Sequence, residues 1–222
     1  MYKNYKIAAL IFLRENSSRV PKKNLRDFHG QPLYKVILST LKKSKFIDQI
    51  IVNTPSKSIA LGCKEIDITV HNRPEWLDKV DSNEANEIIK YDLSLTKYNF
   101  FLQTHSTNPL LKIETIDDSI ETFFENSNEF DSLFSVTPFQ KRFYTNNFSS
   151  INHKINNLVP TQQIDPVLME NSCIYIFSRK SFLKNGNRIG NKPFLYKMDY
   201  FESVDIDTEQ DFQLAEISKK LI

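Results

Sequence analysis

The sequence IAALIFLRENSSRVPKKN, residues 7–24, determines how the rest of this chain is interpreted. Its first seven residues are all apolar. A run of this length is too short to cross a bilayer and is typical of a central strand buried on both faces of a sheet. The polar stretch after it carries four cations: Arg14, Arg19, Lys22 and Lys23. Ligands of α/β proteins bind beyond the carboxyl ends of such strands, so we expect residues 14–24 to form either a binding loop or a solvated basic loop.

Apolar runs and helical patterns alternate outward from this first strand, residues 7–13. We expect further strands at residues 49–54, 67–72, 99–105, 132–137, 173–179 and 194–198. The spacing of apolar residues predicts helices at residues 32–45, 56–63, 84–96, 113–125 and 208–219. Strands separated by helices of this length indicate βαβ units on a parallel sheet. We therefore expect one α/β domain over residues 1–222, Rossmann-like, with a mostly parallel central sheet flanked by helices.

Residues 139–169 differ from the rest of the chain. They are rich in Asn, Gln, Pro and aromatic residues and show no helical spacing. We interpret this stretch as a small irregular or hairpin insertion that makes an oligomer contact.

Composition and charge limit the class of protein. The 222 residues carry a formal net charge of only +2, which gives no electrostatic reason to expect a nucleic-acid partner. No apolar run is long enough for a membrane span, and no small-residue cleavage site follows residues 7–13, so we expect no membrane association and no signal peptide. Two widely separated cysteines, Cys63 and Cys173, are expected to be reduced thiols, which favours a cytoplasmic location.

The residue types of the loop 14–24 suit a triphosphate. Its cations would balance phosphate charge, and Asn16 and Ser17 would donate hydrogen bonds to phosphate oxygens. The loop has the spacing Arg14-x-x-Ser17-x-Arg19-x-Pro21-x-Lys23-Asn24. This spacing resembles the N-terminal signature of cytidylyltransferases that activate sialic acid and related sugar acids. The resemblance implies CTP as the nucleotide, and it implies these nucleotide-binding residues: Arg14, Asn16, Ser17, Arg19, Lys23 and Asn24. Family members usually carry a lysine or arginine at the position of Ser18.

Motifs farther along the chain resemble the same family in the same order. Arg73-Pro74 follows the strand 67–72, where the family has an arginine that holds the nucleotide; a surface arginine after a strand is the alternative. LQTHSTNPLL, residues 102–111, resembles a motif whose glutamine faces the sugar acid, and Gln103 keeps that place. His105 would contact the sugar acid or cap the next helix, and the structural role is the more common one for a lone histidine.

Two more motifs imply contacts with the sugar acid. SLFSVTPF, residues 132–139, resembles the family strand after which basic residues reach across a dimer into the partner's sugar pocket. Lys141 and Arg142 are the candidates here, because a carboxylated substrate favours such cations. ENSCIYIFSR, residues 170–179, resembles a passage whose asparagine contacts nucleotide or sugar, which implies this role for Asn171. The resemblance therefore also implies a homodimer.

The sequence SVDIDTEQDF, residues 203–212, is the most specific of these motifs. In strand geometry Asp205 and Asp207 would lie on one face, because residues two apart share a face. Two adjacent carboxylates repel unless a cation lies between them, and Mg²⁺ prefers carboxylate and phosphate oxygens. We therefore expect Asp205 and Asp207 to hold Mg²⁺. Helix capping by Thr208 and Asp211 is the alternative, but it does not account for both aspartates.

The resemblance implies transfer of CMP from CTP to the anomeric hydroxyl of a 2-keto-3-deoxy sugar acid, with release of pyrophosphate. The expected catalytic residues act through position and charge rather than through a covalent intermediate; they are Arg14, Lys23, Asp205 and Asp207. Two alternatives stay open. A nucleotide-sugar-dependent glycosyltransferase also uses paired aspartates, and a protein of the same fold could bind nucleotide without turnover.

Overall fold

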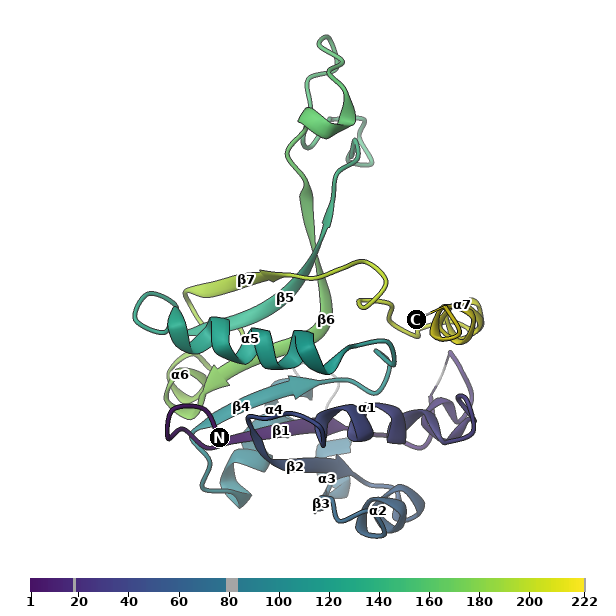
Figure 1. The fold of residues 1–222 in the computed structure, drawn as a ribbon, viewed down its shortest axis with the longest axis vertical. Helices are drawn as coiled ribbons and strands as arrows, with labels where there is room; N and C mark the ends of the chain where they lie inside the picture. Colours follow the sequence, from purple (N-terminus) through teal and green to yellow (C-terminus); the bar gives the residue numbers. More distant parts are fainter. Residues whose placement is uncertain (18, 79–83, 222) are drawn as a thin grey trace.

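The computed structural model describes residues 1–17, 19–78 and 84–221, and a central sheet organises these residues (Figure 1). Within them, seven strands lie in the order β3-β2-β1-β4-β6-β5-β7. β1 pairs in parallel with β2 on one side and with β4 on the other, whereas β6 runs antiparallel to both of its neighbours, β4 and β5. The mostly parallel sheet expected from the sequence is confirmed. The strands are β1 (Ile7–Phe12), β2 (Ile47–Thr54), β3 (Thr69–Asn72), β4 (Phe100–Thr104), β5 (Ser132–Phe139), β6 (Val167–Ser178) and β7 (Pro193–Lys197).

Helices cover both faces of the sheet, as the alternation of buried side chains along β1 shows. Ala8 packs in one buried cluster with Ile89 of α4, whereas Ala9 and Ile11 pack in a larger cluster with Ile37 of α1. No helix in the described part of the chain is both long enough and apolar enough to cross a membrane. The helices are α1 (Leu33–Leu41), α2 (Lys57–Lys64), α3 (Glu75–Asp78), α4 (Glu84–Leu95), α5 (Ile113–Glu125), α6 (Arg179–Asn185) and α7 (Glu209–Lys219), with the 3-10 helices η1 (Lys23–Leu25) and η2 (Thr161–Gln163).

The predicted elements are confirmed within a few residues, with two exceptions. The helix predicted at residues 32–45 ends at Leu41, because the residues after it offer no further apolar side chain before Phe46. The strand predicted at residues 173–179 is only the second half of β6, which begins at Val167. The polar residues 170–172 interrupt the apolar pattern and conceal the first half of this strand.

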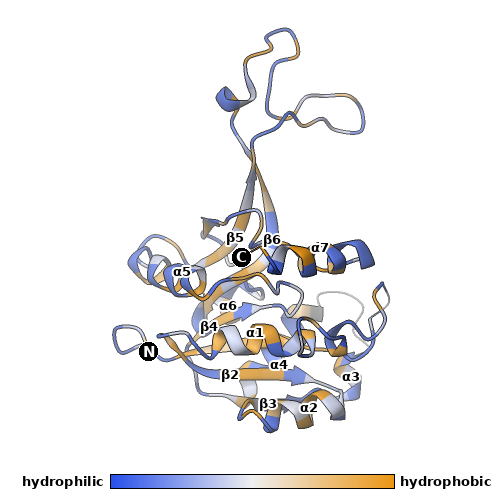
Figure 2. Ribbon diagram, turned by 45° about the vertical axis from the view of Figure 1, so that its right-hand side comes forward, coloured by the Kyte–Doolittle hydropathy of each residue, from blue (hydrophilic) through white to orange (hydrophobic). Residues whose placement is uncertain are grey.

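A long arm projects from the sheet between β5 and β6 (Figures 1 and 2). Phe139 at the end of β5 pairs with Val167 at the start of β6, and we define the arm as residues 140–166 beyond this pair. Apart from η2 and two isolated β-bridges, the arm has no regular secondary structure. Apolar side chains gathered on a surface are typical of an interaction site. The arm exposes five large ones to solvent: Tyr144, Phe148, Ile151, Ile155 and Leu158.

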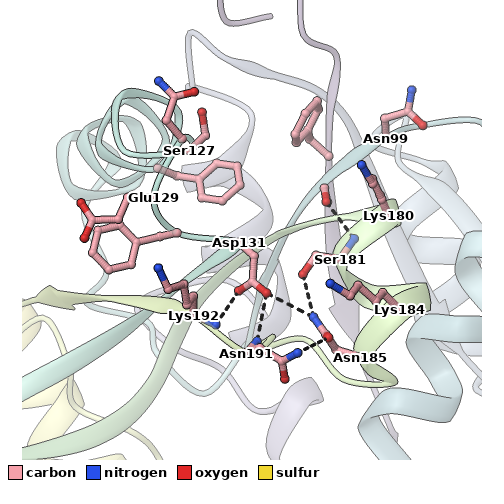
Figure 3. Close-up of a pocket in the computed structure, with 15 residues that line it drawn as sticks. Asn99, Ser127, Glu129, Asp131, Lys180, Ser181, Lys184, Asn185, Asn191 and Lys192 are labelled. Carbon is pink, nitrogen blue, oxygen red and sulfur yellow. Dashed lines mark hydrogen bonds between the residues drawn. The ribbon is translucent and has the colours of Figure 1, made fainter.

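A cleft of about 760 Å³ lies at the amino ends of the parallel strands (Figure 3). Phe100 at the start of β4, Asp131 before β5 and Lys192 before β7 all line it. Asp131 accepts hydrogen bonds from the backbone N–H groups of Asn191 and Lys192, both at 3.0 Å, and so fixes the loop before β7. Ligands of open α/β sheets bind at the opposite, carboxyl ends of the strands, so the candidate site is expected there.

Candidate active site

Two segments from opposite ends of the chain meet beyond the carboxyl end of β1. Lys23, in η1, donates a hydrogen bond from Nζ to the backbone carbonyl of Ile206, which is 183 residues later. The loop after β4 completes this junction, because the Ile206 amide donates to the carbonyl of Thr107 at 2.9 Å. The fold therefore brings the basic loop and the SVDIDTEQDF motif together.

Asn24 fixes the basic loop. Its side-chain amide donates to the carbonyl of Arg14 at 2.6 Å, and its side-chain oxygen accepts from Ser106 Oγ at 2.6 Å. Asn24 and Ser106 are both buried, so these hydrogen bonds satisfy polar groups that water does not reach. The Asn24 side chain thus ties the loop after β1 to the loop after β4.

Asp205 and Asp207 flank the contact made by Lys23. Asp207 forms an ion pair with Arg19, with Oδ1 at 2.8 Å from NH2. Oδ1 of Asp205 is buried and has no hydrogen-bond partner among the described residues. Burial raises the pKa of Asp205; a hydrogen bond from Thr107 to the carboxylate opposes this rise, and repulsion from Asp207 adds to it. Burial lowers the pKa of Lys23, while attraction to the two aspartates opposes that change. These groups form a partly desolvated charge cluster.

Residues 204–207 belong to no strand of the sheet, so the strand geometry considered for the two aspartates is wrong. The segment leads directly into α7, whose cap is reciprocal. Thr208 Oγ1 accepts from the Asp211 amide at 3.3 Å, and Asp211 Oδ2 accepts from the Thr208 amide at 2.7 Å. The predicted helix cap is therefore present. It uses Thr208 and Asp211 and leaves the side chains of Asp205 and Asp207 for another role.

The donor set at the two aspartates fits a magnesium ion. Mg²⁺ binds one or two carboxylates and fills its other positions with substrate phosphates and water. A buried carboxylate oxygen without a partner, such as Asp205 Oδ1, is costly unless a cation binds there. Within the described ranges, no group of three or more His, Cys, Asp or Glu side chains could hold a metal. A metal at Asp205 and Asp207 would therefore also need ligands of other kinds, such as phosphate oxygens and water.

A second cluster lies between the carboxyl ends of β1 and β2. Asp78 accepts from Arg14 Nε at 3.1 Å and from Arg73 NH1 at 3.2 Å. Arg73 also donates to the side-chain oxygen of Asn53 at 2.8 Å. The structure thus places the predicted nucleotide-binding residues Arg14 and Arg73 against the same carboxylate. A cleft of about 340 Å³ next to them is lined by Arg14, Glu15, Asn16, Pro55, Ser56 and Asp78.

Of the two serines in the predicted loop, the structure describes Ser17 but not Ser18. Ser17 is partly exposed, where its hydroxyl can meet a ligand. Ser18, which stands where the family usually has a basic residue, lies outside the described residues.

Gln103, in β4, and His105, directly after this strand, lie side by side. Their Nε2 atoms are 2.9 Å apart, so neutral His105 accepts a hydrogen bond from the Gln103 amide. Burial lowers the pKa of His105 to about 3, and the nearby cations Arg188 and Lys23 contribute to the lowering. His105 does not cap the next helix, since Lys112 occupies that position before α5. Arg188, in the loop before β7, donates to the side-chain oxygen of Gln103.

A protein-family model described as cytidylyltransferase matches residues 8–217 of this chain. The chain belongs to the cytidylyltransferase family. The resemblance seen in the sequence is thereby confirmed, and the protein is a nucleotidyltransferase. Membership of this family also disfavours the nucleotide-sugar-dependent glycosyltransferase.

Relatives of this cytidylyltransferase include proteins named for sugar acids. It is 27% identical over 228 residues to CMP-N,N'-diacetyllegionaminic acid synthase of Legionella pneumophila, with 95% of each chain covered. It is 26% identical over 223 residues to post-translational flagellin modification protein B of Campylobacter coli, covering 95% of this chain and 93% of that protein. It is 28% identical over 217 residues to N-acylneuraminate cytidylyltransferase of Oncorhynchus mykiss. This match covers 95% of the present chain but only 49% of the longer relative.

A solved structure shows the same fold. It is that of CMP:2-keto-3-deoxy-manno-octonic acid synthetase complexed with CTP, which matches 97% of this chain and 99% of its own. The TM-score is 0.70 at 11% sequence identity, so the likeness concerns the fold alone.

Lys141 and Arg142 of this cytidylyltransferase make their contacts in the arm, whereas Asn171 is linked to the aspartate motif through Thr137, which donates to Ser203 Oγ at 2.8 Å. Arg142 donates to the carbonyl of Val159 at 2.6 Å, and the carbonyl of Lys141 accepts from Asn152 at 2.8 Å, so the contacts of both lie in the arm. Asn171 is buried between β5 and β6. It accepts from Ser135 Oγ at 2.5 Å and donates to Thr137 Oγ1 at 3.0 Å, at the irregular pairing of these strands.

The sequence did not predict the residues that hold Arg73 in place by hydrogen bonds. Asn53 accepts from Arg73 and donates to Asp92 Oδ1 at 2.7 Å, and Asp92 also contacts His71 Nδ1 at 2.8 Å. Asp92 is fully buried, and burial raises its pKa. One signal could have found it: Asp92 follows Ile88 and Ile89 on the apolar face of the helix, where an acid needs a buried partner.

We expect His105 to make the stability of this cytidylyltransferase fall as pH decreases below about 6.5, its unfolded-state pKa. The folded-state pKa is about 3, so between the two values the unfolded chain binds a proton that the folded chain does not. The loss is at most about 1.4 kcal/mol per pH unit. Denaturant unfolding at pH 7.5 and pH 5.0 measures it, and His105→Asn should lose less stability than the wild type. An equal loss in both proteins would contradict the low pKa.

Proposed function

We propose that this cytidylyltransferase transfers CMP from CTP to the anomeric hydroxyl of a 2-keto-3-deoxy sugar acid, sialic-acid-like or eight-carbon, and releases pyrophosphate. The strongest support is the junction of Lys23 with the segment that carries Asp205 and Asp207. It gathers cations and carboxylates at one end of the sheet, which is what a metal–triphosphate complex requires. The names of relatives with 95% of this chain covered, a CMP-N,N'-diacetyllegionaminic acid synthase among them, favour a sugar acid as acceptor.

In the proposed reaction the anomeric oxygen bonds to the α-phosphorus, the bond from this phosphorus to the oxygen bridging the β-phosphate breaks, and the hydroxyl proton passes to solvent. Mg²⁺ held by Asp205 and Asp207 would neutralise phosphate charge and lower the pKa of the attacking hydroxyl. Lys23 supplies a positive charge beside the same aspartates. Arg19, which pairs with Asp207 at 2.8 Å, would exchange this carboxylate for a phosphate when CTP binds.

A direct test combines the protein with CTP, Mg²⁺ and a panel of eight- and nine-carbon sugar acids and measures pyrophosphate. We expect release with at least one acid, dependence on both substrates, and loss of release when a chelator removes the metal. No release with any acid would refute the proposed transfer. Binding of CTP without release would point to a nucleotide-binding protein of the same fold.

We also propose that the protein works in the cytoplasm as a homodimer joined through the arm. The arm exposes apolar side chains, with Phe148 86% and Leu158 70% exposed. A second copy of the chain is the partner that forms a closed, symmetric assembly. Lys141 and Arg142, at the start of the arm, would then serve the acceptor site of the other copy. Both cysteines are buried thiols, which suits a reducing compartment.

Substitution of two arm residues, Phe148→Asp together with Leu158→Asp, is expected to convert a dimer into monomers. Each carboxylate would place a charge in an apolar contact, where charged residues are depleted. Sedimentation velocity measures the mass. The control is Leu61→Asp on α2, which changes a similarly exposed leucine (62%) and should leave the dimer intact. A monomeric wild type, or a double variant that stays dimeric, would contradict the proposal that the arm joins the dimer.

A further inference from the structure

Arg188 occupies an unusual position beside Gln103 and His105. Its guanidinium lies 3.6 Å from the centroid of the Tyr175 ring and donates to the side-chain oxygen of Gln103. His105 is hydrogen-bonded to the same glutamine at 2.9 Å. Arg188 thus contacts Gln103, the residue that the family resemblance implies to face the sugar acid.

Within the part of the chain that the structure describes, the positive charge of Arg188 is incompletely balanced by carboxylates. No carboxylate of the described residues forms an ion pair with it. Burial lowers the pKa of Arg188, and Tyr175 and Glu170 offset this only in part. Glu170 itself accepts a hydrogen bond from the Tyr175 hydroxyl. A largely buried guanidinium without a carboxylate partner favours an anionic ligand. A carboxylate would balance its charge and accept two parallel hydrogen bonds from it.

Arg26 has a similar ring contact but differs from Arg188 in its charge partner. It also stacks on an aromatic ring, with its guanidinium 3.9 Å from the centroid of Phe212. Its charge, however, is matched by Glu209, which accepts two hydrogen bonds at 2.5 and 2.9 Å. Stacking alone is therefore common to both arginines, and the missing carboxylate distinguishes Arg188.

We propose that Arg188 binds the carboxylate of the acceptor sugar acid. This inference rests on the proposed function, since it assumes an acceptor that carries an acid group. Arg188 and Lys23 both lower the pKa of His105, so Arg188 lies in the same part of the molecule as the lysine proposed to bind phosphate. A carboxylate held there would be attached to the same carbon as the attacking hydroxyl. Arg188 would in this way select acids over neutral sugars and orient the anomeric oxygen.

The test compares wild type, Arg188→Met and Arg188→Lys in the transfer assay and in inhibition by the sugar acid and its methyl ester. We expect Arg188→Met to raise KM for the acid about 10- to 100-fold, with KM for CTP changed less than about twofold. The wild type should bind the acid more tightly than the ester by a similar factor, and Arg188→Met should bind the two equally. Arg188→Lys should be intermediate, because it keeps the charge but loses the planar fork.

Arg26→Met is the matched control and should leave the preference for acid over ester intact. Thermal unfolding of each variant identifies any loss of folded protein. An Arg188→Met variant that keeps the wild-type preference for the acid would overturn the assignment, and so would a variant that binds acid and ester more weakly by the same factor. A wild-type protein that releases no pyrophosphate with any acid would refute the proposed function itself, which is a distinct result.

Discussion

Replacing Asp205 by asparagine is expected to lower kcat about 100- to 1,000-fold while leaving the protein equally stable or more stable. The amide has the shape of the carboxylate but not its charge, so a metal would lose a ligand. The folded protein is expected to lose little, because burial and repulsion from Asp207 outweigh the stabilising hydrogen bond from Thr107 and the attraction to Lys23, and the pKa of Asp205 is raised on balance. Among the described residues, Asp205 Oδ1 has no hydrogen-bond partner to lose. Pyrophosphate release as a function of Mg²⁺ concentration, together with the thermal unfolding temperature, measures both effects.

A nearby aspartate gives the matched control for this substitution. Asp199 is exposed, and its Oδ1 accepts from the Phe201 amide at 2.8 Å, which an asparagine oxygen can also do. Asp199→Asn should therefore keep wild-type turnover. Asp207→Asn is expected to behave like Asp205→Asn. Near-normal turnover in both Asp205→Asn and Asp207→Asn would show that the metal assignment is wrong.

Removing the charge of Lys23 is expected to lower kcat/KM for CTP about 100-fold or more. Lys23 is buried, and its ammonium lies beside Asp205 and Asp207 at the point where the triphosphate is proposed to bind. Lys23→Met keeps most of the packing of the side chain and removes the cation. Lys23→Arg should not restore activity, since the larger planar guanidinium does not fit the place of a compact ammonium.

Two measurements separate a lost charge from a damaged fold in the Lys23 variants. The first is the thermal unfolding temperature without nucleotide, because Lys23→Met also loses the hydrogen bond to Ile206. The second is the increase of that temperature when CTP is added. This increase should be smaller for Lys23→Met than for the wild type, because the variant is expected to bind CTP more weakly. Lys180→Met removes an exposed cation from the cleft at the other end of the strands (Figure 3) and should change neither activity nor the CTP effect. A Lys23→Met protein with wild-type kcat/KM would refute the role of Lys23.

Local patterns predicted most of the fold because each element has a strong signal of its own. The helix at residues 113–125 was predicted with the bounds of α5, since its apolar residues keep helical spacing throughout. The direction of β6 was not predicted. A strand carries no local mark of whether its neighbours run parallel to it, and β6 follows a long arm rather than a crossover helix.

The candidate site was predicted where a motif marks it and missed where only the fold assembles it. The basic loop and the paired aspartates stand in short, distinctive sequences, and they do meet at Lys23 and Ile206. Arg188 stands in the sequence NGNRIGNK, residues 185–192, which is typical of a surface turn. Nothing in that turn indicates Gln103 as a neighbour, because the two residues are 85 positions apart and meet only through the sheet.

Under the proposed function, the contact of Lys23 with Ile206 also bears on when the protein becomes able to bind CTP during synthesis. A ribosome makes the basic loop early and residues 205–207 some 183 positions later, so a growing chain carries the cations long before the carboxylates. The central strand β1 can pair early with β2, which begins at Ile47, but its second partner, β4, begins only at Phe100. If CTP binds as proposed, a growing chain that still lacks residues 205–207 is expected to gain less stability from CTP than one that contains them. CTP would then favour chains in which the basic loop has already met Asp205 and Asp207.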